Sequence, residues 1–260
     1  MPELLIEKHG RTTVLTLNRP EARNAITPSL TADLTLAVKE FNADPDQYVC
    51  IITGAGERAF CSGGDLGMMA SDAGETSAFP VNEWPDLCGL AESEKPLIAA
   101  VNGVCVSGGF ELALSCDIRI ASESAWFGLF EVKWGVIAGV GVNILPRMVS
   151  MGVAMDLMLS ADRLTAQDAW RLGLVQKLTT PDKLMEEALL KADMIAANSQ
   201  PAVWGTKKVL KFWREVQLLE QQKYFEAVMQ RVILSGDFLE GPKSFAEKRT
   251  PQFKNRWPRI

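Results

Sequence analysis

The sequence LIAAVNGVCVSGGFELALSC occupies residues 97–116 and decides the predicted fold. Its first five residues, Leu97–Val101, form a short apolar run that predicts a strand buried on both faces. The glycine pair at 108–109 precedes a second apolar run that ends at Cys116. This pattern predicts a short helix that begins at the glycines. The stretch is therefore a strand-to-helix unit of an α/β protein.

Similar units lie on both sides of this stretch. Thr27 and Pro28 form an N-cap followed by proline at the first helical position, and apolar residues then recur at helical spacing. Residues 48–52 predict a buried strand after that helix, and residues 117–121 predict another strand. Strands that alternate with helices indicate a parallel α/β core.

The C-terminal half changes from α/β to helical patterning. Residues 165–168 resemble a capping box, and the helix that they open is expected to end before a strand at 174–178. Beyond that strand the pattern is helical, with one break at Pro201. We therefore expect an α/β core over residues 1–200 and a helical region over residues 201–260.

The only histidine of the chain restricts the chemistry that is available. It is His9, at the tip of a hairpin predicted from residues 4–8 and 12–17. A turn residue on the surface explains this position better than a catalytic role. Histidine-rich metal sites and Ser-His-Asp or Cys-His chemistry are therefore not expected, and carboxylates become the expected acid and base groups. Residues 71–82 are polar, small and without a period, and we expect a surface loop there.

Composition excludes several classes of protein. With 47% apolar and 23% charged residues, the chain is globular rather than disordered, and its net charge of −5 disfavours nucleic-acid partners. The five cysteines lack C-x-x-C spacing and lie mostly in apolar runs, as free thiols in a reducing compartment do. The N-terminus is charged early, and the most apolar stretch is interrupted by Asn102 and Glu111. We therefore expect a cytoplasmic protein with no membrane partner.

Two glycine-rich turns follow predicted strands. One contains Gly63 and Gly64, and the other contains Gly108 and Gly109. Glycine allows a ligand to approach unpaired backbone N–H groups, especially where a helix begins. If the two turns converge, they form an oxyanion hole that stabilises charge on a carbonyl oxygen. Each pair alone is explained equally well by an ordinary strand-to-helix turn.

Two glutamates lie in apolar surroundings. Glu111 lies in the apolar stretch 104–116, and Glu131 follows the aromatic segment 126–130. Burial disfavours the charged form of a carboxyl group, so the pKa of each is expected to rise toward the range useful for proton transfer at neutral pH. For Glu111 a structural role and a catalytic role are about equally supported, whereas Glu131 alone is better explained as a carboxylate at the edge of a strand.

Together these segments resemble the enoyl-CoA hydratase/isomerase superfamily, also called the crotonase superfamily. The resemblance follows the right order through nearly the whole chain. It implies an α/β fold, a crotonase-like spiral of ββα turns with a C-terminal helical trimerisation region, and assembly as a trimer or a dimer of trimers. The matching positions are 15–20, 24–25, 52–54, 59–66, 95–103, 108–113, 116–117, 127–128, 131, 135, 245 and 248–249.

The resemblance also implies roles for particular residues. The N–H groups of Gly64 and Gly108 would form the oxyanion hole for the thioester carbonyl of an acyl-CoA. Glu111 and Glu131 fall on the two positions where hydratases carry their catalytic glutamates, and Gly139 matches the glycine whose backbone positions the water. The implied substrate and CoA contacts are Arg23, Ser62, Gly63, Asp65, Leu66, Met68, Trp134, Phe245 and Lys248.

The reaction implied is the addition of water across the C2=C3 bond of a 2-enoyl-CoA, which gives a 3-hydroxyacyl-CoA. Glu111 would deprotonate the water that attacks C3, and Glu131 would supply the proton to C2. No metal is implied, and coenzyme A enters as part of the substrate rather than as a separate cofactor.

Other activities of the superfamily are alternatives to hydration. They are a Δ3,Δ2-enoyl-CoA isomerase, an acyl-CoA dehydratase and an acyl-CoA lyase, while a non-catalytic acyl-CoA-binding protein is a further alternative. Phe130 and Ala138 replace prolines that are common in the family. The spacing of Glu131, Trp134 and Gly135 is similar to the branch that hydrates and cleaves hydroxycinnamoyl-CoA, which lacks a glutamate at the position of Glu111.

Overall fold

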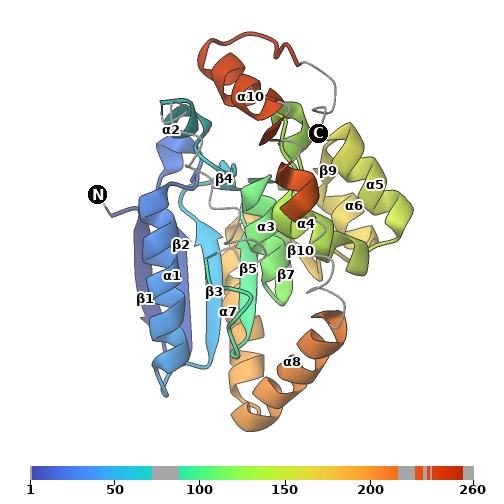
Figure 1. The fold of residues 1–260 in the computed structure, drawn as a ribbon. Helices are drawn as coiled ribbons and strands as arrows, with labels where there is room; N and C mark the ends of the chain where they lie inside the picture. Colours follow the sequence, from blue (N-terminus) through green and yellow to red (C-terminus); the bar gives the residue numbers. More distant parts are fainter. Residues whose placement is uncertain (1, 72–87, 216–225, 231–232, 235, 254–260) are drawn as a thin grey trace.

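The computed structural model describes residues 2–71, 88–215, 226–230, 233–234 and 236–253, which form two β-sheets and the helices around them (Figure 1). The larger sheet has six strands in the order β1-β2-β3-β5-β7-β10. Strand β1 is antiparallel to β2, and all other neighbours are parallel. The strands are β1 (Leu4–His9), β2 (Thr12–Leu17), β3 (Val49–Gly54), β5 (Leu97–Val101), β7 (Ile118–Ser122) and β10 (Lys177–Thr179).

A smaller sheet of four short strands lies in the order β4-β6-β8-β9. Its strands are β4 (Ala59–Cys61), β6 (Val104–Val106), β8 (Trp126–Gly128) and β9 (Leu164–Thr165). A strand of the larger sheet, a strand of the smaller sheet and a helical element follow one another three times along the chain, as β3-β4-α2, β5-β6-α3 and β7-β8-η3. The helical elements are α2 (Leu66–Ser71), α3 (Gly108–Ser115) and the 3₁₀ helix η3 (Glu131–Trp134). This repetition confirms the predicted α/β spiral of ββα turns.

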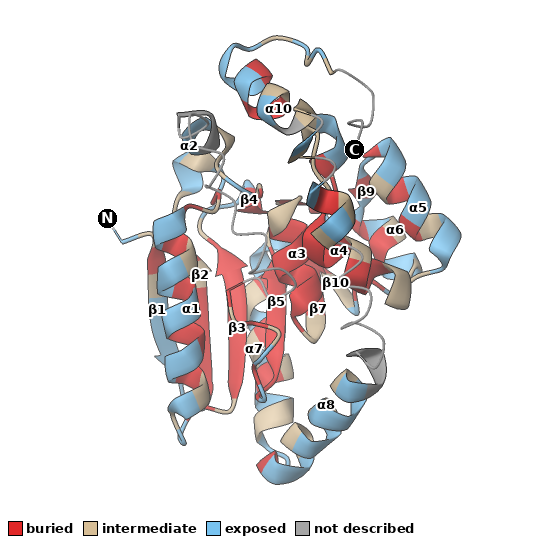
Figure 2. Ribbon diagram, in the orientation of Figure 1, coloured by how far each residue is buried: buried red, intermediate tan, exposed pale blue. Residues whose placement is uncertain are grey.

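Two helices cover opposite faces of the larger sheet, whose central strands are buried (Figure 2). Helix α1 (Pro28–Ala43) begins as predicted, because the N–H of Leu30 donates a 2.9 Å hydrogen bond to Oγ1 of Thr27. Its apolar side packs in the main core with alternate residues of β3, while the intervening residues of β3 pack against α7 (Leu184–Ala196). The alternation along β3 therefore places one residue set on each side of the sheet.

The remaining helical elements lie around this core. Helix α10 packs against both α2 and η3 (Figure 1). None of the helices in the described ranges is long and apolar enough to cross a membrane. The elements are η1 (Pro20–Ala22), α4 (Gly139–Ile144), η4 (Leu145–Arg147), α5 (Met151–Ser160), α6 (Ala166–Arg171), η5 (Pro181–Lys183), α8 (Gln200–Glu215) and α10 (Asp237–Ala246).

Helix α8 contacts the core through Lys207, whose side chain is largely covered. The ammonium of Lys207 lies 2.7 Å from Oδ2 of Asp117 and donates a 2.8 Å hydrogen bond to the carbonyl oxygen of Lys95. The helix begins at residue 200, with Pro201 in its first turn, where proline is compatible with a helix. The division into residues 1–200 and 201–260 stays a prediction.

Three predicted elements differ in detail. The strand expected at 174–178 is instead β10, because the carbonyl of Leu174 accepts a hydrogen bond from the buried guanidinium of Arg119 rather than from a neighbouring strand. Glu131 lies in a 3₁₀ helix and not at the edge of a strand. Of the loop expected at 71–82, the first residue ends α2 and the rest lies outside the described residues.

Candidate active site

Two glycine-rich turns meet at the N-terminus of α3. Gly63 has a φ of +88°, which favours glycine, and a Cβ there would come within 2.9 Å of the Ser107 Cβ and 3.2 Å of the Gly108 nitrogen. A Cβ on Gly108 would lie 3.7 Å from the nitrogen of Gly64. The two turns therefore touch, and this contact requires glycine at position 63.

The local pairing leaves the N–H groups of Gly64 and Gly108 available. The β-bridge between Ile26 and Gly64 uses the carbonyl of Gly63, at 2.8 Å, and the N–H of Asp65, at 3.0 Å. Gly108 is the first residue of α3, where backbone N–H groups have no acceptor within the helix. Two such donors in touching turns can hold one carbonyl oxygen and stabilise negative charge on it.

Glu111 lies in the first turn of α3 and is 1% exposed. Its Oε1 accepts a 2.9 Å hydrogen bond from the N–H of Gly141 at the start of α4. Burial raises the pKa of Glu111 to about 7, although hydrogen bonds from the N–H groups of Gly141 and Val140 oppose that rise. The carboxyl group can therefore exchange a proton near neutral pH.

Glu131 begins η3 and is also buried. Burial raises its pKa well above the ordinary value, and the negative charge of Glu111 raises it further, whereas hydrogen bonds from its own N–H and from the Ser107 hydroxyl lower it. Its Oε2 has no hydrogen-bond partner among the described residues. The pKa of Glu131 is thus held higher by the presence of a second carboxylate.

The pair of glutamates has the electrostatic properties of a donor and an acceptor of protons. Two carboxyl groups that repel each other do not ionise together, so one proton remains on the pair over a wide range of pH. Glu111, which is bound by backbone N–H groups, is the better site for the negative charge. Glu131 then retains the proton.

Five of the residues predicted as contacts follow β4, in the first glycine turn or next to it. Ser62 is tied to the preceding loop, because its N–H donates a 3.1 Å hydrogen bond to the carbonyl of Arg23. The Asp65 carboxylate accepts from Arg19 at 3.0 Å and from the N–H of Met68 at 3.3 Å. Gly63 and Leu66 are predicted contacts in the same segment. The side chains of Met68 and of Arg23, which lies in the preceding loop, are exposed.

The other predicted contacts lie where α10 meets η3. The rings of Trp134 and Phe245 form an edge-to-face pair with centroids 5.5 Å apart. Lys248 follows α10 with an exposed side chain. Gly139 begins α4, but the N–H groups that contact Glu111 are those of the next two residues. The predicted role of Gly139 toward water stays a prediction.

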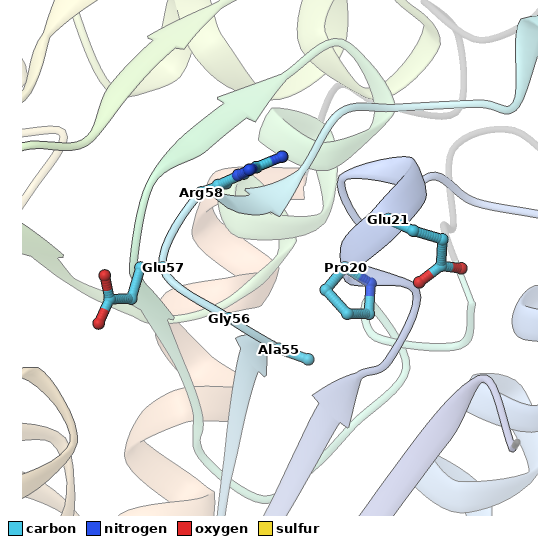
Figure 3. Close-up of a pocket in the computed structure, with 6 residues that line it drawn as sticks. All are labelled: Pro20, Glu21, Ala55, Gly56, Glu57 and Arg58. Atoms are coloured by element: carbon cyan, nitrogen blue, oxygen red, sulfur yellow. The ribbon is translucent and has the colours of Figure 1, made fainter.

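A surface cavity of about 290 Å³ lies beside the β3–β4 loop (Figure 3). It contains two acidic residues and one arginine, and neither Glu111 nor Glu131 lines it. The cavity is therefore separate from the glutamate pair. Its lining residues are Pro20, Glu21, Ala55, Gly56, Glu57 and Arg58.

Metal binding finds no support in the described part of the chain, which contains no group of three or more His, Cys, Asp or Glu side chains placed to hold an ion. The side chain of His9 is exposed beside Glu7, 3.3 Å away. The carboxyl groups that the structure buries at this site are those of Glu111 and Glu131.

Comparison with known proteins agrees with the geometry. A family model described as enoyl-CoA hydratase/isomerase matches residues 7–256. The chain belongs to the enoyl-CoA hydratase/isomerase family.

Members of the enoyl-CoA hydratase/isomerase family from several bacteria match almost the whole chain. This chain is 36% identical to (E)-benzylidenesuccinyl-CoA hydratase of Thauera aromatica, and the match covers 96% of this chain and 98% of that protein. This chain is also 38% identical to a probable enoyl-CoA hydratase of Rhizobium meliloti, and the match covers 97% of this chain and 98% of that protein. The crystal structure of carnitinyl-CoA hydratase from Mycobacterium avium has a TM-score of 0.88 at 35% identity, and the match covers 98% of this chain and 100% of that one.

Sequence reasoning missed two features of the site: the backbone donors to Glu111 and the residue at position 107. The backbone N–H groups of Val140 and Gly141 carry no side-chain signal, and they reach Glu111 only through the packing of α4 on α3. Sequence reasoning also did not single out Ser107, whose φ of +50° places a non-glycine residue in the conformation that glycine favours. A non-glycine residue at the start of a glycine turn is the signal that could have pointed to it.

Proposed function

We propose that this chain is an enoyl-CoA hydratase, a lyase that adds water across the C2=C3 bond of a 2-enoyl-CoA to give a 3-hydroxyacyl-CoA. One observation carries the proposal: two buried glutamates with raised pKa values share one site, beside two touching turns with available N–H groups. The relatives named as hydratases support the same chemistry.

The first step is polarisation of the thioester. The N–H groups of Gly64 and Gly108 donate to the carbonyl oxygen, which withdraws electrons from the conjugated double bond and makes C3 electrophilic. Each donor of this kind is typically worth roughly 3–4 kcal/mol of barrier. Charge that develops as the nucleophile attacks is then held on the thioester oxygen.

The second step is the addition of water. Glu111, with a pKa of about 7, is ionised in a substantial fraction of molecules at neutral pH and takes a proton from the water. The oxygen of the water bonds to C3, and the electrons of the double bond move to C2 and the thioester carbonyl.

The third step is protonation of C2. Glu131 carries the proton because its pKa is raised well above the ordinary value, and its Oε2 has no hydrogen-bond partner within the described ranges. Transfer of this proton to C2 completes the product. Glu111 is then protonated and Glu131 ionised, and one proton passes between them through water to restore the starting state.

We assign the remaining contacts to the substrate on the chemistry of the side chains. The exposed cations Arg23 and Lys248 suit the phosphates of coenzyme A, and Trp134 with Phe245 suits an apolar acyl group. Residues Ser62 to Leu66 and Met68 border the oxyanion turn. The reaction uses no cofactor beyond the coenzyme A of its substrate.

The proposal is tested by hydration of crotonyl-CoA with three variants. Glu111→Gln and Glu131→Gln are each expected to lower kcat by about 10²–10⁴-fold, as general acid and base groups do. Glu123→Gln is the matched control, because Glu123 is exposed and outside the site. Absence of turnover by the parent chain on a panel of 2-enoyl-CoA thioesters would contradict the proposal.

The same panel tests the isomerase alternative. A 3-enoyl-CoA that is converted to the 2-enoyl isomer, with activity retained in Glu111→Gln, would favour isomerisation, because that reaction needs fewer proton-transfer groups. A hydratase loses activity with either substitution.

The chain is further proposed to act as a homotrimer or a dimer of trimers. Helix α8 exposes three large apolar side chains, Val209, Leu210 and Phe212. A helix face of this kind is usually covered by another chain in an oligomer. Light scattering is expected to give three or six times the chain mass for the parent and a smaller assembly for Phe212→Asp.

A cytoplasmic location is proposed on the state of the thiols. The five cysteines, Cys50, Cys61, Cys88, Cys105 and Cys116, are buried, and no disulfide joins any two of them. Free thiols persist in reducing compartments. Fractionation of the producing cell tests this assignment.

A further inference from the structure

The guanidinium of Arg19 is largely covered and binds three separate segments of the chain. Its Nη1 donates a 3.0 Å hydrogen bond to Oδ2 of Asp65 and a 2.8 Å hydrogen bond to the carbonyl of Ala25. Its Nε lies 3.1 Å from Oε1 of Glu3. The donors of a guanidinium have fixed directions in one plane, so these contacts hold the three segments in fixed places relative to one another.

Two of these contacts lie beside the β-bridge that joins Ile26 to Gly64. Ala25 precedes Ile26, and Asp65 follows Gly64. Within the bridge, the carbonyl of Ile26 accepts a 3.0 Å hydrogen bond from the N–H of Asp65. Arg19 therefore holds both sides of the bridge, in each case through the residue next to it.

The bridge sets the direction of the Gly64 N–H. The carbonyl of Gly63 accepts a 2.8 Å hydrogen bond from the N–H of Ile26. The carbonyl and the N–H of one trans peptide unit lie in a plane and point in opposite directions. Because the Gly63 carbonyl faces Ile26, the N–H of Gly64 points away from Ile26. Gly64 is exposed, so a substrate oxygen can reach this N–H.

Ile26 also contacts the second glycine turn. Its Cδ1 lies 3.4 Å from the place that a Cβ on Gly108 would occupy. The segment around Ile26 thus adjoins both proposed oxyanion donors, Gly64 through its backbone and Gly108 through its side chain. Both donors must lie about 2.7–3.1 Å from one oxygen, so a shift of this segment weakens the oxyanion hole.

The contact with Glu3 fixes the other side of Ile26. The Thr27 hydroxyl donates a 2.5 Å hydrogen bond to Oε2 of Glu3 and accepts a 2.9 Å hydrogen bond from the N–H of Leu30 in α1. Oε1 of the same carboxylate binds Arg19. The segment that contains Ile26 is therefore held at the residue before it and at the residue after it.

We propose that Arg19 is a positioning residue for the oxyanion hole, because it holds segment 25–27 against residues 63–65 and so sets the direction of the Gly64 N–H. The inference rests on the proposed function, in which that N–H binds the thioester oxygen. Asp65 then acts through Arg19 and not through the substrate. Its Oδ2 binds the guanidinium, and its Oδ1 accepts a 3.3 Å hydrogen bond from the N–H of Met68 in α2.

The test removes the contacts of Arg19 in the full chain. Asp65→Asn keeps the size of the side chain and an oxygen for the N–H of Met68, but it removes the charge that binds Arg19. Arg19→Gln removes all three contacts, and the milder Asp65→Asn keeps the inference testable if Arg19→Gln does not fold. The matched control is Lys177→Gln, which removes an ion pair with Glu187 between β10 and α7.

The expected result is a loss of kcat below the melting temperature of every variant. With crotonyl-CoA, Asp65→Asn and Arg19→Gln should each lower kcat by about tenfold or more and change KM by less than about threefold, because an oxyanion donor acts mainly on the transition state. Lys177→Gln should keep kcat within about twofold of the parent. The double variant should be within about twofold of Arg19→Gln, since both changes break the same contact.

A readout without turnover uses butyryl-CoA, which has no double bond to hydrate. With ¹³C at the thioester carbonyl, the infrared C=O stretch of the ligand should move to lower frequency on binding to the parent, because hydrogen bonds weaken the C=O bond. Asp65→Asn and Arg19→Gln should lose up to about half of this shift, since one of the two donors is displaced. Lys177→Gln should keep the whole shift.

The two readouts separate this inference from hydration itself. If the parent hydrates crotonyl-CoA and both variants keep the full carbonyl shift, the inference about Arg19 fails and hydration stands. If the parent hydrates no enoyl-CoA but the shift occurs and is reduced in the variants, the proposed function fails and the positioning role is retained. Losses of kcat that multiply in the double variant would also overturn the inference, because Asp65 would then act independently of Arg19.

Discussion

Oε1 of Glu111 accepts a 2.9 Å hydrogen bond from the N–H of Gly141. This contact holds the carboxylate of one ββα repeat at the N-terminal turn of α4, and it opposes the effect of burial on the pKa of Glu111. In the part of the chain that the structure describes, no comparable pair of backbone donors from another helix binds Glu131, which keeps its proton to higher pH. In the proposed mechanism, these different environments make Glu111 the base and Glu131 the acid.

The first prediction concerns the dependence of rate on pH. Hydration needs Glu111 ionised and Glu131 protonated, so kcat/KM should rise with pH through about 7 and fall only near the raised pKa of Glu131. The measurement is kcat/KM for crotonyl-CoA over the pH range in which the enzyme stays folded. A profile that is flat through neutral pH would show that Glu111 is not the base.

The second prediction concerns stability and follows from the same pKa. The pKa of Glu111 is about 7 in the folded chain against an ordinary value of 4.5, so the folded state holds this proton more tightly than the unfolded state. Its contribution is fully present below about pH 4.5 and is lost as pH rises through about 7, a total of about 3 kcal/mol. Glu111→Gln removes this loss.

The check is chemical denaturation at a series of pH values. The free energy of unfolding of Glu111→Gln should increase relative to that of the parent as pH rises across this interval. For the exposed control Glu123→Gln, the difference from the parent should stay constant with pH. Parallel curves for Glu111→Gln would mean that the carboxyl group is solvated in the folded chain.

The spiral itself could be predicted from local patterns. The hairpin of β1 and β2, the cap of α1 at Thr27 and the glycine-started helix α3 all follow from residues close together in the sequence. The burial of Glu111 also followed, because its nearest neighbours along the chain, from Gly108 to Leu114, are apolar or glycine. Local propensity and burial agree at these positions.

The contacts between repeats could not be predicted in the same way. The N–H of Gly141, which binds Glu111, lies 30 positions away along the chain, and no local period specifies such a pair. Glu131 itself resembled an exposed residue because Lys133 follows it, but that lysine turns away to the carbonyl of Ala161. Burial of Glu131 is set by the packing of η3 and not by its sequence neighbours.

The third prediction tests the close contact behind the oxyanion turns. A Cβ on Gly109 would lie 2.2 Å from the carbonyl oxygen of Cys61, a backbone atom that cannot move aside alone. Gly109→Ala should therefore destabilise the chain by about 3 kcal/mol or more. Gly152→Ala is the control, since Gly152 lies in the first turn of α5 with nothing within 4 Å of its added Cβ, and this change should stabilise the helix by up to about 1 kcal/mol. Equal melting temperatures for the two variants would refute the predicted clash.

The fourth prediction tests whether α10 closes one side of the site. Phe245 packs edge-to-face on Trp134, three residues after Glu131, and α10 also contacts α2 beyond the oxyanion turn. Removal of the ring in Phe245→Ala should cost about 1 kcal/mol of docking and raise KM for crotonyl-CoA by about fivefold with little change in kcat, because the reacting groups stay in place. Leu239→Ala removes an exposed apolar side chain from the same helix and serves as the control. An unchanged KM in Phe245→Ala, or an equal rise in Leu239→Ala, would show that the Trp134 contact does not shape the binding site.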